Sequence, residues 1–199
     1  IKQYIGEAYF LRALEYFYRL RTLGDFPIVE KTLPVDSEVL TEASKRMPRN
    51  EVARFILSDL DNAIALTTNS PAKTRITKNA ALILKSRVAL FEATWEKYHA
   101  NTPLVPNGPG WPGAEKEYNK GYQFPAGSAQ DEINFFLDQA MEAASEVAEA
   151  IVLTSNNKTN PNNGSNPYYD MFASHDPSEY PEVVMYREYS LALSATHHF

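Results

Sequence analysis

The sequence predicts a mainly all-α fold, built from antiparallel helix pairs that long irregular loops connect. Apolar residues recur at spacings of three and four in four separate segments, which is the period of a helix with one buried face. Stretches rich in Pro, Gly and Asn separate these segments. Small and aromatic residues recur at similar offsets in the first and third segments, a pattern typical of tetratricopeptide-like repeats.

The first helix is predicted to end near Gly24, because Pro27 prevents its continuation. No capping residue precedes residues 1–4, so we expect the chain to begin inside or just before a helix and to lack upstream sequence. The apolar residues of this helix cover so much of its circumference that it must pack on more than one side. They are Ile5, Tyr9, Ala13, Tyr16 and Leu20, together with Phe10, Leu14 and Phe17.

Three further helices are predicted from their start signals and their apolar stripes. Asn50 is the expected N-cap of the second helix, the third begins after Thr77, and the fourth opens at Ser128 with Asp131 three residues on. The stripes are Val52, Phe55, Ile56, Leu60, Ala63 and Ile64; then Ala81, Leu84, Val88, Phe91 and Trp95; then Ile133, Phe136, Ala140, Ala144, Val147 and Ile151.

The connecting segments have distinct compositions. Residues 102–127 are dense in Pro, Gly and aromatic residues, and residues 155–166 contain six Asn, which predicts a mobile surface loop. Residues 181–188 contain Val183 and Val184 and are the one predicted strand.

Charge excludes one class of partner. The net charge is −6 and the 19 basic residues are scattered among 25 acidic ones, so no basic stripe is present for nucleic acid. No apolar run reaches the roughly 20 residues that span a bilayer, and no signal peptide is present. Any targeting signal is therefore expected upstream.

Several pieces of the chain, in order, resemble the SusD/RagB family. The most recognisable is GEAYFLRAL at 6–14 with YF at 16–17 and LGDFPIV at 23–29. The others are PR at 48–49 before SDLDNAI at 58–64, RITK at 75–78 before RVAL at 87–90, NPYY at 166–169 and PEVV at 181–184. Thr74 stands where the family has Gly, and members of the family are more than twice as long as this chain.

The resemblance implies a surface lipoprotein of the outer membrane in Bacteroidota, seated on a SusC-like TonB-dependent transporter. It implies capture of a nutrient without catalysis or a cofactor; the nutrient is commonly an oligosaccharide and sometimes a peptide. The lipid anchor is expected upstream and would be the only link to the membrane. Residues 1–154 would form the tetratricopeptide-like scaffold, and residues 155–199 would begin the loop-rich substrate-binding portion.

The candidate ligand-binding residues are aromatic and cationic side chains outside the predicted helices. Flat rings with hydrogen-bonding neighbours suit sugars, whose faces are apolar and whose edges are polar. The candidates are Trp111, Tyr118, Tyr122, Tyr168, Tyr169 and Arg187. The alternative, which the composition of the loop favours, is that Trp111 and its neighbours pin the loop onto the helices through their own aromatic rings. Loss of binding in Trp111→Ala with little loss of stability would favour binding, and loss of folding would favour the structural alternative.

Other motifs have simpler explanations. Glu96 and His99 have the Glu-x-x-His spacing of di-iron bundles, but no second such pair exists, which favours a solvated helix end. The run 108–113 resembles a phosphate loop but has Ala114 where Lys is required. The pair His197-His198 lacks other ligands, and Trp95 belongs to a core stripe. No catalytic or metal site is predicted, and a helical-repeat scaffold that binds a protein or peptide is the alternative function.

Overall fold

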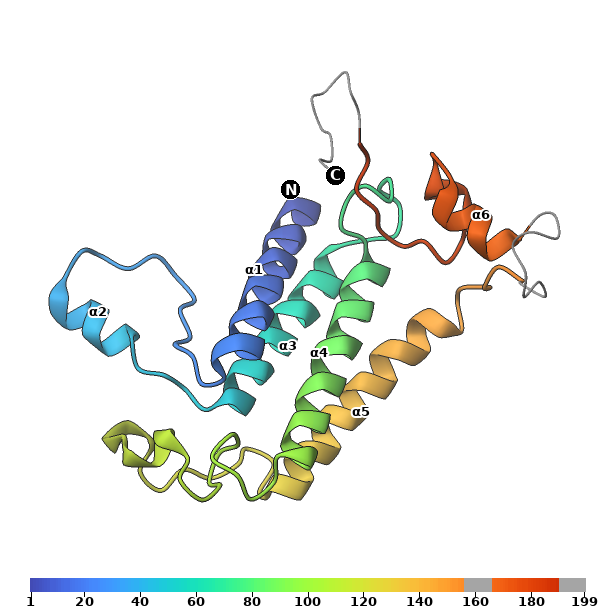
Figure 1. Ribbon diagram of the computed structural model, residues 1–199. Helices are drawn as coiled ribbons and strands as arrows, with labels where there is room; N and C mark the ends of the chain where they lie inside the picture. The colour runs from blue at the N-terminus through green and yellow to red at the C-terminus, as the bar shows by residue number, and fades with distance from the viewer. Residues whose placement is uncertain (156–165, 190–199) are drawn as a thin grey trace.

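A computed structural model describes residues 1–155 and 166–189 of the chain (Figure 1). Residues 156–165 of the mobile loop predicted at 155–166, and the pair His197-His198, lie outside the described residues. The helices are α1 (Lys2–Leu23), α2 (Ser37–Ala43), α3 (Arg49–Leu66), α4 (Lys78–Tyr98), α5 (Ala129–Ala148) and α6 (Pro167–Ala173), with short 3-10 turns η1 (Pro112–Glu115), η2 (Glu117–Asn119) and η3 (Pro177–Glu179).

The four long helices run alternately in opposite directions, and each packs on its neighbours in the chain (Figure 1). Helix α1 pairs with α3, α3 contacts α4, and α4 pairs with α5. The shared core is apolar and contains Phe10, Phe17, Leu20, Val52, Ile56, Leu60, Val88 and Phe136. The predicted fold of antiparallel helix pairs is confirmed.

Local signals explain most helix ends. Gly24 ends α1 with a positive φ of 68°, a conformation that glycine adopts without a steric cost. Thr77 and Ser128 cap α4 and α5 through their side-chain oxygens, as predicted. The prediction for Asn50 is wrong: α3 begins after Pro48, and Asn50 is a buried residue of its first turn whose amide bonds a carboxylate.

The predicted strand at residues 181–188 is also wrong, since no β-strand forms within residues 1–155 and 166–189. Its backbone meets the α3–α4 connection through the Tyr186 amide, which donates to the Lys73 carbonyl, and through the Val184 carbonyl, which accepts from the Thr77 hydroxyl, but no described strand lies beside it. An isolated antiparallel bridge joins Phe26 and Met47, with both N–H···O distances 3.1 Å. This bridge closes the excursion that contains α2, a helix that periodicity missed because it is short and has no buried residue.

None of the helices in the described residues combines the length and the apolar character needed to cross a lipid bilayer.

Close packing of α1 on the end of α3 depends on Gly6. A Cβ built on this buried glycine would lie 2.6 Å from Cγ2 of Thr67 and 3.1 Å from Cβ of Leu66. The Thr67 hydroxyl donates to the Ala63 carbonyl at 2.7 Å, which fixes the orientation of that side chain. The helix–helix distance at this point is therefore set by the absence of a side chain.

We expect Gly6→Ala to lower the free energy of unfolding by about 1–3 kcal/mol, because overpacking here outweighs the better helix propensity of alanine. Chemical denaturation measures the change. Ala8→Gly, at an exposed position of the same helix, is the control and should cost no more than about 1 kcal/mol. An unchanged or raised stability in Gly6→Ala would contradict the close approach.

Candidate functional site

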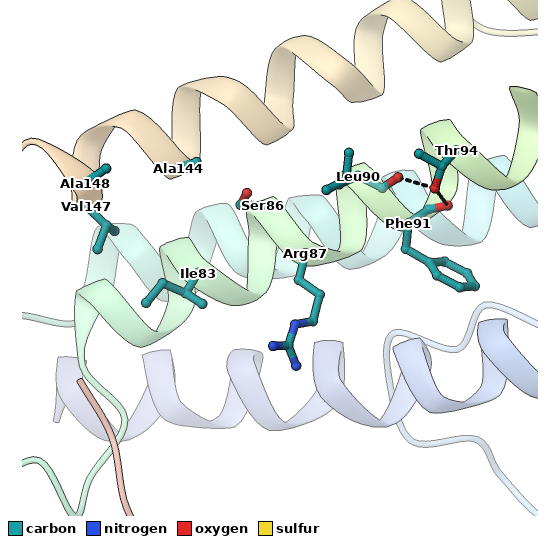
Figure 2. Close-up of a pocket in the computed structure, with 9 residues that line it drawn as sticks. All are labelled: Ile83, Ser86, Arg87, Leu90, Phe91, Thr94, Ala144, Val147 and Ala148. Carbon is teal, nitrogen blue, oxygen red and sulfur yellow. Dashed lines mark hydrogen bonds between the residues drawn. The ribbon is translucent and has the colours of Figure 1, made fainter. Parts of the chain in front are cut away.

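Two surface depressions differ in chemistry. The larger, a groove of about 640 Å³, lies along α4 and α5 and is lined almost wholly by apolar groups, including Ile83, Leu90 and Val147 (Figure 2). Figure 2 shows its one charged side chain, Arg87, directed away from α5. Because recognition of a sugar needs polar partners as well as apolar contact, the groove is a poor candidate for a sugar-binding site.

The second depression combines aromatic rings with charged side chains. This cleft of about 330 Å³ lies between the C-terminal end of α1, the start of α3 and the loop that joins α4 to α5. Its lining includes Asp25, Arg46, Trp95, Trp111, Lys116 and Tyr118. We take this cleft as the candidate functional site.

Asp25 connects the three elements that form the cleft. Its Oδ1 accepts the backbone N–H of Arg49 at the first residue of α3, at 2.9 Å, and its Oδ2 accepts Nε1–H of Trp111, at 2.8 Å. Burial raises the pKa of Asp25, although these hydrogen bonds and the nearby Arg46 and Arg49 oppose the rise. Asp25 therefore holds the helix start and the loop together at the back of the cleft.

The structure places Trp111 in the interior of the loop, with only 3% of its surface exposed. Its ring packs near Tyr122, with the centroids 5.8 Å apart, and over Gly113, where a Cβ would meet the indole at 2.1 Å. One edge of Trp111 borders the cleft while the indole N–H is used by Asp25. These contacts favour the anchoring role over a free stacking platform.

We expect Trp111→Ala to lower the free energy of unfolding by about 3–5 kcal/mol, because it removes a large buried ring. Trp111→Phe keeps much of the apolar volume but leaves Asp25 with one donor fewer, so a loss of about 1–3 kcal/mol is expected. Thermal and urea denaturation measure both. A Trp111→Ala protein as stable as the parent would instead return Trp111 to the role of an exposed binding residue.

A buried ion pair lies directly behind the cleft. Nε and Nη2 of Arg49 donate to the two carboxylate oxygens of Glu92 at 2.8 and 2.7 Å, and both side chains are buried. The guanidinium also lies 4.3 Å from the centroid of the Trp95 ring, whose Nε1–H donates to the Leu104 carbonyl at 3.1 Å. This arrangement fixes α3 to α4 and makes Trp95 a half-buried wall of the cleft. The sequence predicted Trp95 as a core residue, but it does not belong to the apolar core of the described residues.

A second buried network joins α3 to α5. Glu132 accepts two hydrogen bonds from Arg54, at 2.7 and 2.9 Å, one from the Asn50 amide at 3.0 Å and one from the Ala126 N–H at 3.1 Å. Burial raises the pKa of Glu132, but these donors more than offset it and the net shift is downward. Tyr122 donates its hydroxyl to Asn50 at 2.8 Å, and its own pKa is raised chiefly by burial.

Glu96 lies one turn beyond Glu92 on α4. The prediction that Glu96 lies at a solvated helix end is wrong, because its side chain is buried. It is 4% exposed, and neither of its carboxylate oxygens has a hydrogen-bond partner among the described residues. Burial first, and then the neighbouring Glu92 and Glu132, raise its pKa to about 9, so Glu96 is protonated at neutral pH. The sequence pattern missed this burial because Glu96 lies outside the apolar stripe.

The six predicted binding residues do not form one site. Trp111, Tyr118 and Tyr122 lie in the loop at the cleft, where Tyr118 is 39% exposed and accepts the Arg46 N–H at 3.3 Å. Tyr168 and Tyr169 are exposed on α6 at the opposite end of the helical bundle, and Arg187 lies in the segment beyond it (Figure 1). Arg187 lies over the Tyr189 ring, 5.2 Å from its centroid.

Sequence reasoning missed Asp25, Arg46 and Lys116 as cleft residues. The signal for Asp25 was present, since Leu23-Gly24-Asp25 and Pro48-Arg49 are two of the quoted motif pieces and both border the cleft. Nothing in the sequence indicated that these two pieces face each other. Arg46 and Lys116 stand outside any motif, so only the fold brings them together.

The other motif pieces are also joined by ion pairs between helices. Arg12 on α1 donates to both oxygens of Asp59 on α3, each at 2.7 Å, and to the Glu30 carbonyl at 2.9 Å. Arg75 donates to both oxygens of Glu7, at 3.0 and 2.6 Å, and thereby lowers the pKa of Glu7. These motif residues are therefore scaffold, and they explain how segments far apart in the sequence keep a fixed register.

The cleft has the composition of a binding site. No group of three or more metal-ligating side chains occurs in the part of the chain that the structure describes. Asp25, which lines the cleft, and Glu92, which pairs with the lining residue Arg49, are both engaged as structural acceptors. Together, the helix pairs and the aromatic, cation-lined cleft define a helical-repeat protein with a polar surface site.

Comparison with known sequences identifies a family to which the chain is similar. Residues 1–90 match the SusD-like family that is described as "Starch-binding associating with outer membrane". Over this part the chain is similar to the SusD-like family, as its motifs indicated. No curated protein matches the chain.

A solved structure is similar as well. It is a SusD-like protein from Bacteroides fragilis, 34% identical, with a TM-score of 0.42, and the match covers 48% of this chain and 19% of that one. The chain therefore spans about a fifth of the length of that relative.

Proposed function

We propose that this chain is part of a non-catalytic surface protein that captures a glycan for delivery to a SusC-like TonB-dependent transporter. The observation that carries the proposal is the match of residues 1–90 to a starch-binding, outer-membrane-associated family. The cleft adds local support, because it sets half-buried and exposed aromatic rings beside hydrogen-bonding side chains. Capture in this form depends on stacking and hydrogen bonds and needs no chemical step.

Two parts of the chain would have different tasks. Residues 1–154 would be the scaffold that rests on the transporter, and residues 155–199 would begin the substrate-binding portion. The exposed Tyr168, Tyr169 and Arg187 belong to that second portion and stay candidates for ligand contact. The protein would be a lipoprotein at the cell surface, held to the outer membrane by an anchor outside these residues.

Binding of a protein or peptide is the second candidate, and the apolar groove along α4 and α5 favours it. An apolar groove between two helices suits a partner helix, whereas sugars need polar edges to be recognised. The two kinds of binding are compatible: the groove would face the transporter and the cleft would face the nutrient.

Calorimetric titration of the intact protein with a panel of oligosaccharides and peptides separates the two candidates. We expect binding of at least one oligosaccharide at micromolar to millimolar concentration, with no product released on prolonged incubation. Peptide binding without any oligosaccharide binding would favour the second candidate. Release of shorter sugars would contradict a non-catalytic role.

A further inference from the structure

The cleft is cationic on a chain that is acidic. Four cationic side chains line it, namely Arg21, Arg46, Arg49 and Lys116, against the single carboxylate of Asp25. The chain as a whole has a net charge of −6. The cleft is therefore locally positive although the chain as a whole is negative.

Three of these cations form no ion pair in the described part of the chain. Arg49 is neutralised by Glu92, but none of Arg21, Arg46 and Lys116 forms an ion pair within residues 1–155 and 166–189. Arg21 lies over the Phe17 ring, 5.6 Å from its centroid. Glu115 and Glu117 flank Lys116 in the sequence, but neither lines the cleft, and Glu117 pairs with Lys120 at 3.6 Å.

Carbonyl groups at the end of α1 would repel an anion, and Arg46 covers them. Its Nη2 donates to the backbone carbonyl of Leu23 at 2.8 Å, and its Nε donates to the backbone carbonyl of Asp25 at 2.7 Å. Hydrogen bonds to carbonyls satisfy the donors without neutralising the charge, and the Asp25 carboxylate, which lies near both Arg46 and Arg49, balances only part of it. The negative end of the helix dipole is thereby masked while the guanidinium charge stays at the cleft.

Aromatic surface lies within the same cleft. Tyr118 presents an exposed ring with Lys45 Nζ 5.7 Å from its centroid, and Trp95 forms a half-buried wall. The volume of about 330 Å³ is at the low end for small-ligand sites, which suits one or two sugar rings. A ligand that fits this lining has a flat, partly apolar ring and a negative charge.

We propose that the cleft binds an anionic unit of a glycan, a uronate or a sulfated sugar, with Arg21, Arg46 and Lys116 facing its charge and Tyr118 contacting its ring. This inference rests on the proposed capture of glycans and names the class of glycan. Arg and Lys recognise carboxylate and sulfate through charge-assisted hydrogen bonds. Attraction of this kind weakens as salt rises.

Calorimetry on the intact protein tests the proposal with three oligosaccharides of equal length. They are an oligogalacturonate, its methyl-esterified neutral form and a sulfated oligosaccharide. We expect the oligogalacturonate or the sulfated oligosaccharide to bind at least tenfold more tightly than the neutral form. Raising the salt from about 0.05 to 0.5 M should remove most of that difference, because screening weakens exposed charge pairs. Whichever of the two anionic oligosaccharides binds more tightly shows whether the cleft prefers a carboxylate or a sulfate group.

The matched variants change the same number of charges at two places. Arg21→Gln combined with Lys116→Gln removes two unpaired cations of the cleft and leaves Arg46 to cover the carbonyls. We expect it to weaken binding of the anionic oligosaccharide about tenfold, with thermal stability unchanged. Lys2→Gln with Lys31→Gln, at exposed positions outside the cleft, should leave binding within twofold.

The outcomes separate this inference from the function on which it rests. Binding of the neutral form as tightly as the anionic ones, or an unchanged affinity in the cleft variant, overturns the anionic assignment and leaves glycan capture standing. Failure of every oligosaccharide in the wider panel overturns the proposed function itself.

Discussion

Replacing Arg49 with Met is expected to lower the free energy of unfolding by about 3–5 kcal/mol, the usual cost of leaving one member of a buried ion pair alone. The loss arises because Glu92, fully buried, would keep its desolvated carboxylate without the two hydrogen bonds it now accepts. Glu96, one turn away, adds a second carboxyl group and no cation. Urea denaturation at neutral pH measures the change.

Two control variants test whether the unpaired Glu92 carboxylate causes this loss of stability. Arg19→Met breaks the exposed pair with Glu15 on α1 and should change stability by no more than about 0.5 kcal/mol. Adding Glu92→Leu to Arg49→Met should restore much of the loss, because an apolar pair of similar volume replaces the orphaned charge. A double variant as unstable as Arg49→Met would show instead that the contact of the guanidinium with Trp95 is the larger contribution.

The second large effect is the pH dependence that Glu96 imposes. Its pKa is about 9 in the folded protein, while the unfolded chain returns it to its ordinary value of 4.5. Between these values the folded state holds a proton that the unfolded state has released, so stability falls as the pH rises. The expected slope is about 1.4 kcal/mol per pH unit, and it ends above the folded pKa.

Glu96→Gln should remove this slope. The amide is neutral at every pH, so the variant and the parent should be similar near pH 5, and the variant should become progressively more stable toward pH 9. Urea denaturation at pH 5, 7 and 9 measures the difference. Glu132 and Glu7, whose pKa values are lowered, titrate below this window and are common to both proteins. A constant difference across the three pH values would contradict a protonated Glu96.

The helices were predictable because their signals are local. Thr77, Ser128 and Gly24 act through backbone groups a few residues away, and the apolar stripes have the period of the helix. Asn50 failed as a cap because the helix begins at Arg49 after Pro48, two residues earlier than a cap at Asn50 implies. The Asn50 amide instead donates to Glu132, more than eighty residues away. Local sequence does not encode such a partner.

The site was less predictable than the fold for the same reason. Trp111 and Tyr118 were singled out by residue type, but burial of Trp111 depends on Asp25 from the other side of the cleft. The cationic sign of the cleft comes from Arg21, Arg46 and Lys116, which three different segments supply. In sequence they are three of nineteen scattered basic residues, and only the tertiary structure gathers them.

The pairing of each long helix with its neighbours in the chain also bears on how the protein folds. Helices α1, α3, α4 and α5 contact one another in sequence order, and the longest connection that must close is the loop between α4 and α5. Helix pairing is therefore sequential, and pairing between elements adjacent in the chain favours faster folding than pairing between distant segments. Each hairpin can nucleate separately and recruit the next helix, as in other repeat proteins. The cleft lies where the α1–α3 hairpin meets the α4–α5 loop, so it forms only after both halves have docked.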